Sequence, residues 1–331
     1  MLYDPLRVGP ITLENRLVMP PMQSDRASRG HVSDELIEYY RERSRFSRPG
    51  LIILEHCCIC EEGRADAGQL SLAEDSLIDE HRRLSDAIHE AGSRVLAQLN
   101  HAGSAAEPFA ACERVSASAV NNPRKKLSGS PRPLEAEEIR ALQGRFAEAA
   151  LRAVRAGYDG VEIHCAHGYL LNQFYSPLTN LRRDAYGAGS VEDRCRFLLE
   201  TLAAVRSAVG AECAVSVRLG GADYLPGGST EEDAAEACRL LREAGADLLD
   251  ISGGMCGYLR PGHAEAGYFA SMTKKIRPAV SPLPVLLTGG VRSAAEAERL
   301  LEEGAADLIG VGRALFRDAH WGEKQQAAAA D

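Results

Sequence analysis

Two histidines and a tyrosine that could bind an oxygen atom or transfer a proton lie within one short stretch of the chain. The segment "EIHCAHGYLLNQFYSPLTN", residues 162–180, contains His164, His167 and Tyr169. A histidine pair can ligate a metal, pack in a core, or donate N–H groups to an oxygen that becomes negative, and a phenol can deliver a proton. "HCAH" lacks the glutamate of the HExxH zinc motif and has no third ligand nearby, so a metal is disfavoured. Two histidines beside a tyrosine favour an oxyanion-binding and proton-donating set.

These residues follow a predicted β-strand, and the same kind of strand recurs eight times along the chain. Short apolar runs alternate with amphipathic helical stretches, most of which end at or near a glycine. Strands are expected at 16–21, 51–56, 94–101, 160–164, 214–219, 247–253, 284–289 and 307–312. Helices are expected at 33–45, 75–92, 135–157, 191–210, 229–245 and 293–304. This repeat predicts a (β/α)8 barrel, which explains eight evenly spaced units better than a doubly wound sheet does.

In such a barrel, the side chains at the carboxyl ends of the strands face the mouth where active sites form. The side chains expected there are Met22, Gln23, His56, Gln98, Asn100, His101, His164, His167, Tyr169, Arg218 and Arg313. This set lacks the paired carboxylates of a glycosidase and the lysine of a Schiff-base aldolase. Two irregular stretches, 103–134 and 253–275, follow strands and are expected to lie over the same rim.

Glycines follow each of the last two predicted strands, in "TGG" and "GVGR". Bare backbone N–H groups at these turns, with Arg313 beside them, would suit a phosphate group. The loops after strands seven and eight of a barrel frequently bind one. The alternative is that Gly289, Gly290, Gly310 and Gly312 only form tight turns. The two pairs together with Arg313 favour the phosphate site.

Arg218 ends the fifth predicted strand, inside the apolar run "AVSVRL". A buried guanidinium needs an anionic or strongly accepting partner, because an unpaired buried charge is very costly. The partner is either a carboxylate on a neighbouring strand, such as Glu162 or Asp250, or a bound group that develops negative charge. The residues alone leave both alternatives open.

Charge and composition narrow the range of partners. The chain has 331 residues and a formal net charge of −9, and its densest basic run is the short Arg124-Lys125-Lys126, so nucleic acid is not expected. No apolar run approaches the roughly 20 residues of a membrane helix, and the first residues do not resemble a signal peptide. We therefore expect a cytoplasmic protein without a membrane partner. We also expect one domain over residues 1–331, with 321–331 as a frayed tail.

The cysteines point to the same compartment. Nine are present, an odd number, and most lie inside apolar segments, which favours buried thiols in a reducing cytoplasm over a disulfide framework. The one cluster is Cys57, Cys58 and Cys60, and it has no second CxxC to complete a zinc or iron–sulfur site. No metal is predicted.

Taken together, these motifs resemble the old yellow enzyme family of NADH:flavin oxidoreductases and ene-reductases. The resemblance is to its bacterial single-domain branch and to the barrel domain of 2,4-dienoyl-CoA reductase. The segments that carry it are "LENRLVMPPM" (13–22), "QLNHAG" (98–103), "AGYDGVEIHCAHGYLLNQFYSPLTNLRRDAYG" (156–187), "SVRL" (216–219), "TGG" (288–290) and "GVGR" (310–313). The resemblance implies a (β/α)8 barrel that binds FMN non-covalently over the carboxyl ends of its strands.

The resemblance also implies a role for each matching residue. The implied FMN-binding residues are Pro20, Pro21, Met22, Gln23, His56, Gln98, Arg218, Gly289, Gly290, Gly312 and Arg313. His56 would contact the ring through its backbone, Gln98 would bind the pyrimidine edge, and Arg218 would lie by N1 and the C2 carbonyl. The glycines and Arg313 would hold the phosphate.

The implied reaction is the reduction of a C=C bond. NADPH or NADH would reduce FMN, and a hydride would then pass to the β-carbon of an enone or an enoyl thioester. His164 and His167 would hold the carbonyl oxygen as enolate charge builds, and Tyr169 would protonate the α-carbon.

Several positions depart from the family pattern. Gln23 stands where relatives often have Cys or Thr, Asp25 stands where one subclass has Tyr, and Ser104 stands where Arg is usual. One alternative is the same flavin barrel catalysing a redox-neutral isomerisation or an oxidation. Others are a flavin-free phosphate-sugar aldolase or isomerase, and a non-enzymatic binding barrel. A homo-oligomer is left open.

Overall fold

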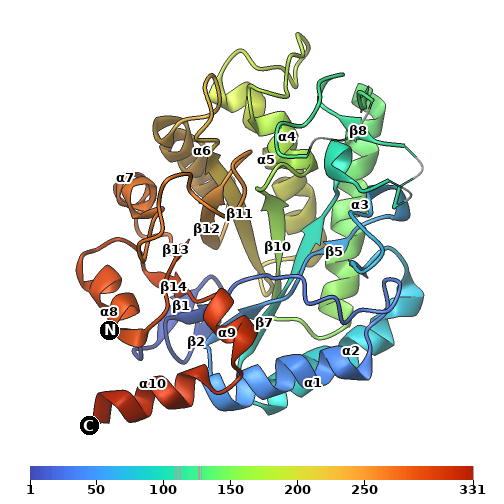
Figure 1. Ribbon diagram of the computed structural model, residues 1–331. Helices are drawn as coiled ribbons and strands as arrows, with labels where there is room; N and C mark the ends of the chain where they lie inside the picture. The colour runs from blue at the N-terminus through green and yellow to red at the C-terminus, as the bar shows by residue number, and fades with distance from the viewer. Residues whose placement is uncertain (109, 112, 126, 128, 331) are drawn as a thin grey trace.

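The computed structural model describes residues 1–108, 110–111, 113–125, 127 and 129–330; Cys112 and Lys126 lie outside the described residues. Within this part of the chain, eight parallel strands close into a barrel (Figure 1). In order around the barrel they are β3 (Leu17–Met19), β4 (Leu51–Ile53), β7 (Arg94–Asn100), β10 (Gly160–Cys165), β11 (Ala214–Ala222), β12 (Leu248–Gly253), β13 (Val285–Thr288) and β14 (Leu308–Gly310). The predicted (β/α)8 barrel is confirmed, and each strand overlaps its predicted range.

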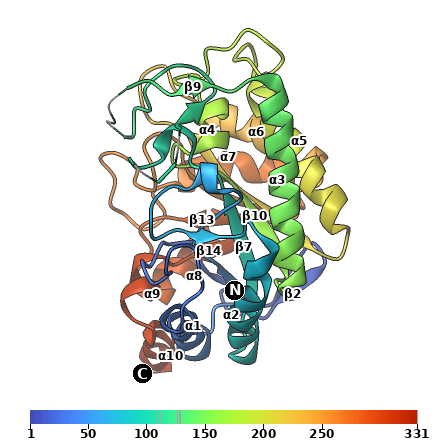
Figure 2. The ribbon, with the colours of Figure 1, turned by 90° about the vertical axis from the view of Figure 1, so that its right-hand side faces the viewer.

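Helices surround the strands, as Figures 1 and 2 show from two sides. They are α1 (Asp34–Glu42), α2 (Ile78–Glu90), α3 (Ala136–Arg155), α4 (Leu170–Tyr175), α5 (Val191–Val209), α6 (Glu231–Glu243), α7 (Ala270–Val280), α8 (Ala294–Glu302), α9 (Arg313–Arg317) and α10 (Trp321–Ala330). A π-helical turn, Arg43–Ser47, continues α1, and 3-10 turns span Glu61–Gly63, Asp75–Leu77 and Gly103–Ala105. Hydroxyl side chains accept from backbone N–H groups at four helix starts, at Ser33, Ser190, Thr230 and Ser293. These caps explain why the predicted helices begin where they do.

Helix α7 is a correction to the sequence analysis, which predicted an irregular stretch over 253–275. The helix begins at Ala270, has no side-chain cap at Phe269 and contains Pro278. A helix without a capping residue and with an internal proline gives no clear signal in the sequence. It is stabilised instead by burying Met272 and Ile276 and by packing against α6.

A short hairpin closes the amino-terminal end of the barrel. Its strands, β1 (Leu6–Val8) and β2 (Ile11–Leu13), are antiparallel. The apolar cluster at this end contains Val8, Ile11, Leu13, Val18, Leu51, Ile53, Leu96, Ala214, Leu248, Leu286 and Leu308. Because this cluster fills the barrel interior at one end, a ligand can enter the barrel interior at the opposite end, where the strands finish.

The remaining segments lie around this framework. Strands β5 (Cys57–Cys58) and β6 (Leu70–Ser71) continue the sheet beside β7, and β8 (Val115–Ser116) pairs with β9 (Arg132–Pro133). Helix α10 forms where the composition predicts a frayed tail, and the Trp321 indole N–H donates to the Arg292 carbonyl at 2.9 Å. The described cysteines are free, and all but Cys256 are buried. No helix within the described ranges is long and apolar enough to cross a membrane.

Candidate active site

A cavity of about 410 Å³ opens at the carboxyl ends of the strands. Every residue that the sequence analysis assigned to catalysis or to FMN lines it: Pro20, Pro21, Met22, Gln23, His56, Gln98, His164, His167, Tyr169, Arg218, Gly289, Gly290, Gly312 and Arg313. The cavity walls also include Arg124, Ser252, Tyr258, Tyr268, Thr288, Val291, Gly310 and Phe316. The structure therefore brings together residues that come from all parts of the sequence.

A tight turn after β10 presents the two histidines and the tyrosine. His167 and Gly168 both have positive φ angles, 59° and 74°. The ring centroid of His164 lies 5.2 Å from that of His167 and 5.2 Å from that of Tyr169. The backbone therefore reverses direction within two residues and directs the three rings to one side of the cavity.

Burial sets the protonation of these three side chains. It lowers the pKa of His164 and of His167 well below the ordinary value, and the positive charge of Arg218 adds to the effect on both. Burial also raises the pKa of the Tyr169 phenol to about 12. At neutral pH the histidines are therefore uncharged and the phenol keeps its proton.

The ring nitrogens of the two histidines have different surroundings. His167 Nε2 lies 2.7 Å from the Ser252 hydroxyl oxygen, which orients that ring. His164 Nδ1 is buried and has no hydrogen-bond partner in the described part of the chain. Since a buried polar atom without a partner is costly, His164 is suited to bind a ligand atom.

The His56 side chain anchors the cavity wall near Gln23. Gln69 Nε2 and Asn100 Nδ2 each lie 2.9 Å from His56 Nδ1, so that nitrogen accepts and Nε2 carries the proton. His56 Nε2 then donates to Gln23 Oε1 at 3.1 Å. Gln23 Nε2 donates in turn to Asp66 at 2.8 Å. The family resemblance implies only a backbone role for His56, so the hydrogen bonds of its side chain were not predicted.

Beneath the cavity, β7, β10, β11 and β12 place polar side chains in register. Glu162 pairs with Gln98 on one side and with Ser216 on the other, and Arg218 pairs with Asp250. Gln98 Nε2 donates to Glu162 at 2.9 Å, and the Ser216 hydroxyl lies 2.8 Å from the other Glu162 oxygen. Alternate residues of a barrel strand point inward, so these groups share the barrel interior.

Arg218 has the carboxylate partner that was one of its two predicted alternatives. Its Nε lies 3.2 Å from Asp250 Oδ2, although the two are not aligned as a hydrogen bond. One guanidinium thus faces two buried carboxyl groups. Burial raises the pKa of Glu162 to about 8, and the charge of Asp250 adds to this. At neutral pH Glu162 therefore holds a proton. Burial also raises the pKa of Asp250, while the charge of Arg218 opposes this effect, and Asp250 is the carboxyl group that pairs with Arg218.

The glycines after β13 and β14 expose backbone to the cavity. A Cβ atom on Gly290 would lie 2.2 Å from the Glu265 carbonyl oxygen, so this position excludes any larger residue. A Cβ atom on Gly312 would lie 3.2 Å from the Met22 sulfur and would narrow the cavity between them. Arg313 is exposed beside them and forms no ion pair with a described residue. Bare backbone and an available guanidinium fit a phosphate group.

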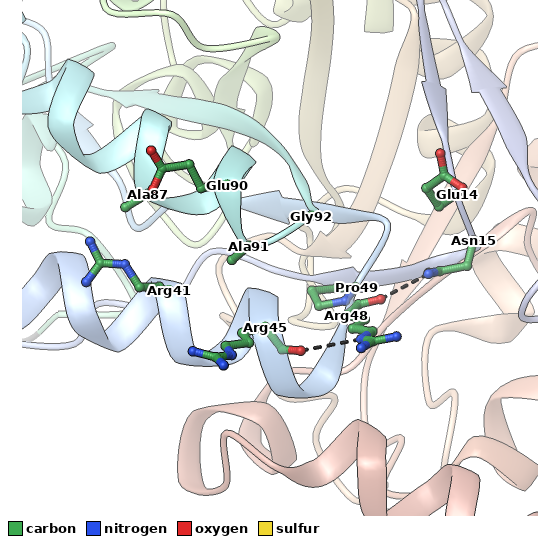
Figure 3. Close-up of a pocket in the computed structure, with 10 residues that line it drawn as sticks. All are labelled: Glu14, Asn15, Arg41, Arg45, Arg48, Pro49, Ala87, Glu90, Ala91 and Gly92. Carbon is green, nitrogen blue, oxygen red and sulfur yellow. Dashed lines mark hydrogen bonds between the residues drawn. The ribbon is translucent and has the colours of Figure 1, made fainter.

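A second hollow, of about 550 Å³, lies at the other end of the barrel. Figure 3 shows its walls, which are Glu14, Asn15, Arg41, Arg45, Arg48, Pro49, Ala87, Glu90, Ala91 and Gly92. These residues precede β3, β4 and β7 rather than follow them. None was predicted as a site residue. In the described ranges, no group of three or more His, Cys, Asp or Glu side chains is placed to hold a metal ion.

Comparison with known proteins identifies the class to which this barrel belongs. The pattern of the NADH:flavin oxidoreductase / NADH oxidase family matches residues 1–331, the whole chain. An NADH oxidase of Thermoanaerobacter brockii is 38% identical over 331 residues, 98% of this chain and 50% of that protein. A metal reductase of Desulforamulus reducens is 38% identical over 322 residues, 96% of this chain and 47% of that protein. The chain belongs to this family of flavin-dependent oxidoreductases.

Solved structures agree with the assignment. The chain matches a 2-naphthoyl-CoA reductase with a TM-score of 0.89 at 26% identity, over 99% of this chain and 52% of that one. Morphinone reductase in complex with tetrahydroNAD gives 0.85 at 27% identity, covering 99% of this chain and 91% of that one. An old yellow enzyme homologue of Zymomonas mobilis gives a TM-score of 0.84 at 28% identity, covering 99% of this chain and 93% of that one. The predicted resemblance is confirmed. The chain spans about half the length of the curated relatives that it matches.

Proposed function

We propose that this protein is an FMN-dependent enzyme that uses NADH or NADPH to reduce the C=C bond of α,β-unsaturated carbonyl compounds. The observation that carries the proposal is the shared cavity, in which His164, His167 and Tyr169 face the residues suited to a flavin. The names of two structural neighbours support it, because they denote reductases of morphinone, a ketone, and of 2-naphthoyl-CoA, an acyl thioester. We also propose that residues 1–331 form one FMN-binding domain.

The residues present fit FMN. The glycine turns and Arg313 would hold its phosphate, and Gln98 and Arg218 would lie against the polar part of its ring. When bound, FMN supplies a carrier that accepts a hydride from a nicotinamide and donates one to a carbon atom. Arg218 remains positively charged beside Asp250, and a positive charge there favours an anionic partner.

His164 and His167 would bind the carbonyl oxygen of the substrate. Both are neutral at physiological pH because burial lowers the pKa of each ring. Each can therefore donate one N–H bond to the oxygen as negative charge builds on it, without the cost of maintaining a buried charge. Ser252 fixes the ring of His167 for this task.

Tyr169 would deliver the proton to the α-carbon. Its pKa of about 12 keeps the phenol protonated throughout the physiological range. The ring lies 5.2 Å from His164 and 5.3 Å from His56, measured between centroids. The donor and the oxygen-binding pair are thus on the same wall of the cavity.

Product analysis tests this proposal. The protein loaded with FMN is incubated without oxygen with NADH or NADPH and with 2-cyclohexen-1-one. We expect cyclohexanone to form in a ratio of about one to the reduced nucleotide consumed. Nucleotide consumption without a saturated product would contradict the proposal. The same assay in air measures electron transfer to oxygen, the reaction suggested by the NADH oxidase relative.

A further inference from the structure

The lining of the cavity is unbalanced in charge. Among the described residues that line it, three are arginines and none is an aspartate or a glutamate. Arg218 faces Asp250, and Arg313 lies at the glycine turns suited to a phosphate. Arg124 has neither role. Its guanidinium has no hydrogen bond or ion pair to any residue that the structure describes, and it lies over the Tyr258 ring.

Arg124 is held in place from the same turn that carries the histidines and the tyrosine. The buried Asn122 donates from Nδ2 to the Gly168 carbonyl at 2.7 Å. The Asn122 side-chain oxygen accepts from the Arg124 backbone N–H at 3.0 Å. Gly168 lies between His167 and Tyr169 in the chain. The position of Arg124 is therefore tied to the turn after β10, although the two segments are far apart in the sequence.

The loop after β12 makes room for the guanidinium. A Cβ atom on Gly257 would lie only 1.4 Å from Arg124 Nη1, so the guanidinium occupies the space of a side chain at that position. Arg124 Cζ lies 5.7 Å from the centroid of the Tyr258 ring, and that ring lies 6.2 Å from the His167 ring. The charge of Arg124 acts on the site, because it contributes to the low pKa of His167 after burial, Arg218 and His164.

We propose that Arg124 binds an anionic group, a carboxylate or a phosphate, on the molecule that enters the cavity beside His164 and His167. This inference rests on the proposed function. A half-buried guanidinium without a protein partner is a good ligand for such oxyanions, because its planar N–H groups form paired, charge-assisted hydrogen bonds. The anionic group belongs either to the oxidising substrate or to the pyridine nucleotide. Arg124, the first residue of the short basic run 124–126, thus lines the cavity.

The test compares Arg124→Ala and Arg124→Lys with Lys125→Ala in the FMN-loaded protein. Lys125 is a matched control, because it is adjacent and its Nζ lies 3.5 Å from Glu107. One arm measures KM and kcat with 4-oxopent-2-enoate and with its methyl ester, which differ by one negative charge. The other arm measures the dissociation constant of NADH and NADPH from the rate of flavin reduction. Binding of the saturated 4-oxopentanoate, followed through the flavin spectrum, adds a readout without turnover.

We expect Arg124→Ala to weaken one of these ligands about tenfold while kcat changes little. If the substrate carries the anion, KM rises for the acid but not for the ester, and 4-oxopentanoate binding weakens in parallel. If the nucleotide carries it, only the dissociation constant of the nucleotide rises. Arg124→Lys should restore part of the loss, and Lys125→Ala should cause none. Unchanged constants in both arms would overturn this inference alone, whereas a protein that binds no FMN would overturn the proposed function.

Discussion

At the scale of single residues, the central feature is that the two histidines are neutral. A buried imidazolium pair beside Arg218 would bring three positive charges together, and burial prevents this by lowering the pKa of both rings. An uncharged imidazole can stabilise a developing negative charge by donating a hydrogen bond from its N–H group. The residues are thus preorganised as donors rather than as acids.

Removing both donors should slow substrate reduction far more than it affects the fold. For His164→Ala/His167→Ala, we expect the rate at which an enone reoxidises the reduced flavin to fall at least ~100-fold. The double asparagine variant keeps N–H donors and should retain more of the rate. His263→Ala is the control, because His263 lies on an exposed loop and pairs with Glu265. Rapid-mixing absorbance measurements give the rates. An unchanged rate in the double alanine variant would refute the assignment of the pair.

At the scale of elements, parallel register explains how four strands build the floor of the cavity. Glu162, on β10, is fixed by Gln98 on β7 and by Ser216 on β11, and Asp250 on β12 lies beside Arg218. A slip of one residue in any of these strands would turn its polar group outward. The register of these four strands therefore determines which polar groups lie beneath the cavity.

The protonated state of Glu162 predicts a pH-dependent stability. The pKa of Glu162 is about 8 in the folded protein, whereas its ordinary value is 4.5. Between pH 4.5 and pH 8, the folded protein therefore holds a proton on Glu162 that the unfolded chain has lost. The free energy of unfolding therefore falls as pH rises through this window, by about 1.4 kcal/mol per pH unit at most for one group, and levels off above it.

Glu162→Gln mimics the protonated carboxyl and should remove this slope. Urea unfolding of the wild type and the variant between pH 5 and 9 measures it, with the exposed Glu148→Gln as control. Equal pH dependence in wild type and Glu162→Gln would show that Glu162 is ionised in the folded protein.

The turn after β14 makes a separate prediction about the phosphate. Arg313→Ala should weaken FMN about 10- to 100-fold, since charge-assisted hydrogen bonds contribute roughly 1.5–3 kcal/mol. Riboflavin, which has no phosphate, should bind equally to both proteins. Arg317→Ala, in the same helix, serves as the control. Fluorescence titration of the flavin-free protein gives the constants, and equal losses for FMN and riboflavin would place the phosphate elsewhere.

At the scale of the whole molecule, the barrel could be predicted because apolar strand segments and amphipathic helical segments alternate regularly along the sequence. Strand and helix patterns locate the strand ends, and the family resemblance assigns roles to residues there; all residues assigned to catalysis or to FMN line one cavity. Asn100 and His101, which were also expected at the mouth, are not among the residues that line it. Arg124 and Tyr258 were missed because they lie in long loops. Their path depends on contacts such as the one between Asn122 and Gly168, which no local pattern specifies. The side-chain role of His56 was missed for the same reason, since its partners come from separate segments.

The two ends of the barrel differ in composition, so the residues that stabilise the fold are separate from those that line the cavity. Apolar residues fill the amino-terminal end, and polar residues gather at the other end around the cavity. This chain matches about half the length of the curated relatives, 50% of one and 47% of the other. We expect it to bind FMN without a further segment. The bound flavin should raise the melting temperature, because a ligand at 100 times its Kd stabilises by about 2.7 kcal/mol.

The most direct test of the account is the visible spectrum of the purified protein during anaerobic titration. We predict a flavin spectrum that bleaches when NADH or NADPH is added and returns when 2-cyclohexen-1-one follows. A protein that stays colourless after incubation with FMN, or a bleached flavin whose colour no enone restores, would contradict the proposed reduction of unsaturated carbonyl compounds.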